Sequence, residues 1–145
     1  MVYSIEICER YGPNGDGGRR RYGIAASDAV SKGMMVYLVD PRTVSWAALA
    51  QSKGIAGITD EEKKSTDTTL TSISVLTDLI ANMRASGAIN AGDWVMPDLV
   101  QNTARAWAPS IVSSALLSVA SFAVVFGRSL DTVADGETAG IRINL

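Results

Sequence analysis

The sequence predicts a mainly β protein, a small β-barrel or β-sandwich with one short helix and an extended N-terminal arm. Three observations support this prediction. Several segments alternate apolar and polar residues with a period of two, β-branched residues are prominent in them, and Gly, Pro or Asp-Gly turn signals recur about every ten residues. A chain of 145 residues can bury about 70% of its unfolded surface, so one domain of this kind needs no disulfide to hold it.

The first 23 residues are predicted to form the arm, and residues 24–145 the β-rich domain. Residues 2–7 alternate like a short strand, but six of the 13 residues in 11–23 are Gly or Pro. Glycine loses the most conformational entropy on folding, so we expect a loop or arm that is ordered only where a partner holds it. Removal of residues 1–22 should then leave a folded domain.

Turn residues delimit the next elements. Residues 33–41 begin with a glycine turn and continue as an apolar strand, which the proline at its end closes because it has no N–H to donate. Residues 43–54 show helical spacing with a capping residue and a terminal glycine, and give the one predicted helix, on which Trp46 should pack against the sheet. Residues 54–59 are predicted as a strand and 60–69 as a solvated connection.

The second half of the chain is predicted as further strands. Residues 70–85 alternate and are rich in β-branched side chains, which predicts a strand that continues after a bend at residues 77–78. Two or three strands are predicted over residues 111–130. The apolar run in this range is interrupted by serines and is shorter than the roughly 20 apolar residues that a membrane-spanning helix needs. An Asp-Gly turn at residues 135–136 leads into an alternating strand over residues 139–145. No membrane association is expected.

Two related phrases lie 59 positions apart in the sequence. Residues 29–36 read AVSKGMMV and residues 88–95 read AINAGDWV, each with an apolar residue three positions before Gly and a Val three after it. Because glycine reaches positive φ without strain, each phrase is interpreted as a tight turn that begins a strand, and the two units as related halves of one small barrel. Chance recurrence among 13 glycines is the alternative. The residues assigned to structural turns are Gly33, Gly92, Asp93, Gly127 and Gly136.

Composition disfavours several classes of function. The chain has no histidine and one cysteine, Cys8, so the usual general base, the commonest metal ligand and an all-cysteine metal site are missing. A net charge of −2 lacks the basic footprint of a dedicated DNA-binding protein. The acidic residues 60–69 include two lysines and no glycine, unlike a calcium-binding loop. We therefore expect no catalytic site, no cofactor and no metal.

Four segments occur in an order that is typical of one family: GMMVYLVD, KGIAGIT, ISVLTDLIANMRASGAINAGDWV and FGRSLDTVADGETAGIRINL. In order and spacing, over about residues 24–145 and apart from residues 97–110, they resemble the head decoration (cement) proteins of tailed bacteriophages, of the β-tulip or lambdoid head-stabilising type. The resemblance implies a protein that binds the outside of an icosahedral capsid and clamps neighbouring capsomers.

The same resemblance implies a partner and a location. The partner would be the major capsid protein, and the protein itself a homotrimer, or else a dimer, on the outer capsid surface of the virion after synthesis in the host cytoplasm. Another virion subunit, of the tail tube or connector, is the alternative, and a ligand-binding β-barrel is the third possibility.

The arm carries the candidate capsid contact. Three adjacent arginines are flanked by two tyrosines, and arginine both forms bidentate pairs with carboxylates and stacks on aromatic rings. A contact with nucleic-acid phosphate is a less favoured interpretation, and a solvated turn without a partner is the structural alternative. The candidate residues are Tyr11, Arg19, Arg20, Arg21 and Tyr22.

Two tryptophans are assigned by their surroundings. Trp107 lies in a polar segment close to a proline and is the candidate for an oligomer interface, where tryptophan is enriched because it buries a large area. Trp94 lies where a turn enters a strand and is expected in the core.

Overall fold

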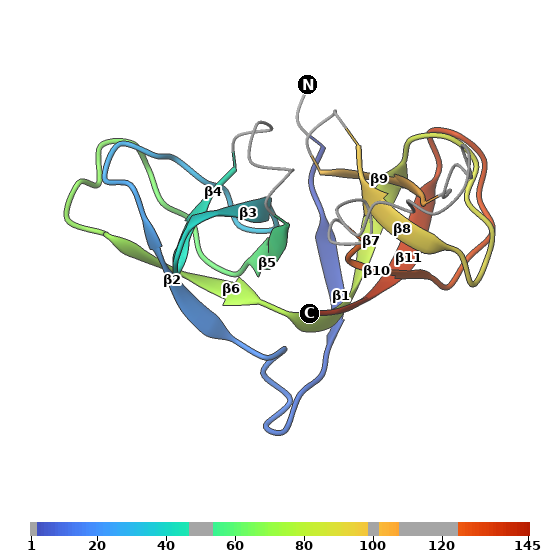
Figure 1. Ribbon diagram of the computed structural model, residues 1–145, viewed down its shortest axis with the longest axis horizontal. Helices are drawn as coiled ribbons and strands as arrows, with labels where there is room; N and C mark the ends of the chain where they lie inside the picture. Colours follow the sequence, from blue (N-terminus) through green and yellow to red (C-terminus); the bar gives the residue numbers. More distant parts are fainter. Residues whose placement is uncertain (1–2, 47–53, 99–101, 108–124) are drawn as a thin grey trace, which may run out of the picture.

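The computed structural model describes residues 3–46, 54–98, 102–107 and 125–145. It contains two small β-barrels that lie side by side, with strand β1 (Glu6–Arg10) between them (Figure 1). The first is a closed barrel with the strand order β2-β4-β3-β5-β6. Its strands are β2 (Arg20–Ile24), β3 (Met35–Asp40), β4 (Thr43–Ser45), β5 (Ile55–Thr59) and β6 (Ser72–Leu76). The predicted mainly β class and the small barrel are thus confirmed.

The second barrel is built from a six-stranded sheet with the order β1-β7-β11-β10-β8-β9. Strands β7 and β9 also pair in parallel, and this pairing closes β7, β11, β10, β8 and β9 into a ring. Strand β1 pairs with the first half of β7, and β9 pairs with the end of β7. The strands are β1 (Glu6–Arg10), β7 (Asp78–Ala85), β8 (Trp94–Pro97), β9 (Thr103–Ala106), β10 (Gly127–Ser129) and β11 (Thr138–Asn144). Thr77 alone separates β6 from β7, as the predicted bend requires.

Both barrels have the same connectivity. In each, the first strand is parallel to the third and antiparallel to the fifth, and the second strand is antiparallel to the third and fourth. The backbone N–H groups of Gly33 and Gly92 donate to the carbonyls of Thr59 and Ser129, both at 2.8 Å. The repeated phrase therefore marks a repeated structural unit. The interpretation as halves of one barrel was wrong, since five strands already close each unit.

The two barrels are joined by a shared apolar core. The first barrel encloses a small core of its own, which includes Val36. The larger core fills the second barrel and continues onto the outer face of the first through Met35, Tyr37 and Ile58. Strand β3 is therefore buried on both faces, and its side chains alternate between the two cores.

The predicted N-terminal arm is wrong. Glu6 to Arg10 pair with Asn82 to Leu79 of β7, Ile5 is only 5% exposed in the large core, and residues 20–23 pair with β6. The glycine-rich segment is a loop that leads from β1, which pairs with β7, to β2 of the first barrel. Since removal of residues 1–22 would take away β1 and most of β2, a folded remainder is no longer expected.

The predicted helix over residues 43–54 is also not supported. Its first residues form β4, because Arg42 adopts a φ of 55° and reverses the chain directly after β3. Trp46 is 39% exposed rather than packed on the sheet, and residues 47–53 lie outside the described part of the chain, as do 111–124 of the predicted later strands. No helix in the described ranges is long and apolar enough to cross a membrane.

Candidate functional site

The loop of residues 11–19, here the junction loop, lies against the point where the chain passes between the barrels (Figure 1). The carbonyl of Gly17 accepts hydrogen bonds from the backbone N–H groups of Thr77 and Asp78, both at 2.9 Å. The Thr77 hydroxyl donates to the carbonyl of Gly18 at 2.9 Å. A Cβ at Gly18 would meet that hydroxyl oxygen at 2.5 Å, so glycine is required for this close approach. The loop thus fixes the connection between the two barrels.

The three adjacent arginines lie at the start of β2, and two of them are held by carboxylates of this same chain. Arg19 Nη2 lies 2.5 Å from Asp60 Oδ2, and Arg21 Nη1 lies 3.0 Å from Glu61 Oε1. Arg20 is exposed and makes no ion pair with the rest of the described chain. The acidic residues that follow β5 are therefore the immediate partners of Arg19 and Arg21.

The two candidate tyrosines lie apart from these ion pairs. Tyr22 is half-buried against the core of the first barrel. The ring of Tyr11 lies under the guanidinium of Arg142, 4.2 Å from the ring centroid, and its hydroxyl donates to the carboxylate of Glu9. That hydrogen bond is the main reason why the pKa of Tyr11 is raised above its ordinary value, while Arg142 acts in the opposite direction. Tyr11 therefore contacts the second barrel.

A cluster of charges that sequence reasoning missed surrounds Asp60. Arg10 Nη2 lies 2.8 Å and Lys32 Nζ 3.7 Å from Asp60 Oδ1, and Arg19 approaches the other oxygen. The Asp60 side chain is 5% exposed, whereas the three cations are 33%, 45% and 61% exposed in the order Arg10, Arg19, Lys32. We call these four residues the Asp60 cluster. The prediction that Asp60 belongs to a solvated connection was wrong; an acidic residue directly after a buried strand was the available signal.

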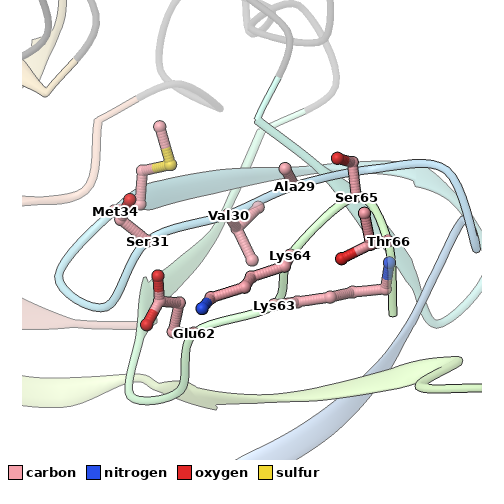
Figure 2. Close-up of a pocket in the computed structure, with 9 residues that line it drawn as sticks. All are labelled: Ala29, Val30, Ser31, Met34, Glu62, Lys63, Lys64, Ser65 and Thr66. Carbon is pink, nitrogen blue, oxygen red and sulfur yellow. The ribbon is translucent and has the colours of Figure 1, made fainter. Parts of the chain in front are cut away.

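An open depression of about 410 Å³ lies on the first barrel (Figure 2). Lys63 is 2% exposed, and its ammonium donates to the carbonyls of Ala26 and Asp28, both at 2.7 Å. Figure 2 shows the side chains of Lys63 and Lys64 running in opposite directions. The buried ammonium therefore serves to hold the loop before Val30. The depression is lined by Ala29, Val30, Ser31, Met34, Glu62, Lys63, Lys64, Ser65 and Thr66.

The second barrel exposes an aromatic side chain. Trp94 is 43% exposed, so its predicted place in the core is wrong, and the guanidinium of Arg128 lies 4.9 Å from its ring centroid. The two residues border a depression of about 380 Å³. Trp107 is half-buried, and its backbone N–H donates to the carbonyl of Trp94 at 2.7 Å. Trp107 therefore lies at the edge of this exposed surface.

The assigned turn glycines fall into two groups. Gly33, Gly92 and Gly136 have φ values of 77°, 90° and 82°, which fits turns, and Asp93 accepts a hydrogen bond from the N–H of Asn90 within the second of them. Gly127 lies instead in β10, where a Cβ would meet the carbonyl oxygen of Arg142 at 2.4 Å. Its glycine is needed for close strand packing.

Over the described ranges, no three acidic or cysteine residues are grouped so as to hold a metal ion.

No protein-family model matches this chain, and no curated protein matches it. Among solved structures, the chain is similar to the N base of the head fiber gp8.5 in bacteriophage phi29, with a TM-score of 0.50 and 16% sequence identity. The likeness covers 87% of this chain and 94% of that chain. At this level of identity it is a likeness of fold that extends over nearly the whole of both chains.

Proposed function

We propose that this protein is a structural component of a tailed-bacteriophage head, a decoration protein that binds the outer surface of the icosahedral capsid. The observation that carries the proposal is the fold likeness, over 87% of this chain, to the base of a phage head fiber. The sequence segments that resemble decoration proteins point the same way. In this role the protein binds the major capsid protein, stabilises contacts between capsomers and acts without catalysis or a cofactor.

The joined barrels suit such a role physically. A protein that bridges capsid subunits must transmit force without bending, and here a shared core and the junction loop connect the barrels. The binding energy of one copy can be modest, because many linked contacts act together on one shell. A homotrimer with Trp107 at its interface would add such contacts.

The capsid contact is proposed to include the exposed arginines at the start of β2. The ion pairs with Asp60 and Glu61 hold two guanidinium groups in fixed positions, and Arg20 remains available for a carboxylate of the capsid. Tyr11 and Tyr22 complete the proposed contact region.

Quantitative mass spectrometry of purified virus particles tests this function. A fixed, simple ratio of this chain to the major capsid protein is the expected result, because decoration proteins occupy repeated positions on the shell. A copy number far below that of the capsid protein would instead indicate a tail or connector subunit. Absence of the chain from the particles would refute a structural role in the virion.

A further inference from the structure

We propose that the Asp60 cluster is a docking point for an acidic segment of a partner protein. The identity of the partner rests on the proposed function, which makes it the capsid protein. The chemistry comes from the cluster itself, in which three cations from separate parts of the chain converge on one carboxylate. Only the fold brings these residues together. Arg10 ends β1 and Arg19 ends the junction loop, whereas Lys32 lies in the turn before β3 and Asp60 directly follows β5.

The cluster has an excess of positive charge. Three positive side chains face the single negative charge of Asp60, which leaves two positive charges without a counterion among the residues of the cluster. Asp60 is almost fully buried, whereas the cations are partly exposed. The negative charge is therefore shielded from a partner, and the positive charges are presented to it.

The cations also retain hydrogen-bond donors. Arg19 contacts Asp60 through one nitrogen, although a guanidinium has five N–H groups. Lys32 Nζ is 3.7 Å from the nearest Asp60 oxygen, so its attraction is electrostatic and its donors are free for a closer acceptor. Lys32 also borders a small depression of about 180 Å³ next to Ser4 and Asn102. A second carboxylate can thus approach Lys32 and Arg19 from solvent.

The surroundings favour an acidic protein segment over nucleic acid. Asp60 and Glu61 lie among the cations, and the chain as a whole has a net charge of −2. Binding of nucleic acid depends on many cations along a stripe that follows the phosphates, whereas this cluster presents three cations at one point. A short segment with one or two carboxylates matches the size of the cluster, and arginine binds a carboxylate with two parallel hydrogen bonds.

Binding of a fluorescein-labelled oligoglutamate peptide to the full chain tests the proposal. Lys32→Glu should weaken this binding by about fivefold, because it turns an attraction at the cluster into a repulsion. Lys64→Glu is the matched control, since it makes the same change of net charge at an exposed lysine of the Figure 2 depression; it should weaken binding by less than about twofold. Unchanged unfolding midpoints of both variants show that the fold is intact.

The site is located by NMR, as peptide-induced shifts of the side-chain N–H signals of Arg10 and Arg19. Equal weakening by the two lysine variants, or no shift at these arginines, would overturn the proposal. Tighter binding of a single-stranded oligothymidylate of the same charge would overturn it in favour of nucleic acid. Peptide binding with the chain absent from virus particles would refute the proposed function and leave the docking point; presence in particles without peptide binding would refute the docking point alone.

Discussion

Alanine at Gly33 and at Gly92 should have unequal effects on stability, although the two turns are equivalent in the two barrels. Both glycines have φ values in the left-handed region, 77° and 90°. Their surroundings differ, however. A Cβ at Gly33 would lie 2.6 Å from the carbonyl oxygen of Ile5, just before β1, whereas the nearest atom to a Cβ at Gly92 is Arg128 Nη2 at 3.8 Å.

The expected magnitudes follow from these distances. The left-handed conformation alone costs a residue with a Cβ about 1 to 2 kcal/mol, and this should be the whole effect of Gly92→Ala. Gly33→Ala bears the same cost and must also displace the backbone at Ile5, which resembles the overpacking of a core and adds about 1 to 3 kcal/mol. Ile5 is 5% exposed in the large core, so its displacement disturbs the contact between the barrels.

Urea unfolding of the two variants and the parent protein measures the difference. The free energy of unfolding should fall for both variants, and by at least about 1 kcal/mol more for Gly33→Ala. Gly87→Ala serves as a control for the strain alone, because its φ is 88° and a Cβ there has no atom within 4 Å. If all three substitutions cost the same, the close approach of residue 5 to the first turn is not a feature of the folded protein.

Three further predictions concern single side chains. Lys63→Met should lower the free energy of unfolding by about 1 to 3 kcal/mol, because two carbonyls lose a charged donor. Urea unfolding measures this, and an unchanged or higher free energy of unfolding would contradict the prediction. Glu9→Gln should lower the pKa of Tyr11, since the Glu9 carboxylate raises it, and an NMR titration with an unchanged pKa would refute this. In the parent protein the hydrogen bond between Tyr11 and Glu9 stabilises the fold below about pH 10, and this stabilisation is lost as the pH rises through the folded-state pKa of Tyr11. Trp107→Ala should shift a homotrimer toward monomer in sedimentation equilibrium, with Trp46→Ala as the control, and a monomeric parent protein would exclude the interface.

The two barrels share one connectivity but differ at the position of Asp60. At the position of Asp60 in the first barrel, the second barrel carries Leu130, which is 50% exposed. Arg10 and Arg19 come from β1 and the junction loop, which are not among the five strands that close the first barrel. The docking point is thus a property that one barrel gained from the N-terminal strand and loop, rather than a feature of the repeated unit.

Much of the fold could be predicted because it depends on local chemistry. Alternation fixed the strands of residues 70–85, glycine marked the turns at Gly33 and Gly92, and the recurrence of one phrase revealed a repeated unit. The predicted helix begins wrongly, since residues 43–45 form β4. The apolar spacing there is compatible with either structure, and the left-handed Arg42 that turns the chain into β4 has no distinctive local signal.

The sequence by itself determined the β class, the turns and the repeat, because these follow from backbone preferences and from side-chain periodicity within a few residues. The tertiary structure alone decided that each unit closes as its own barrel, that residues 6–10 form a strand on β7, and that three cations meet at Asp60. Barrel closure and charge clustering both depend on contacts between residues that are far apart in the chain. A glycine-rich segment resembles a free arm in the sequence for the same reason, since the partners that order it lie some 60 residues away, at Thr77 and Asp78.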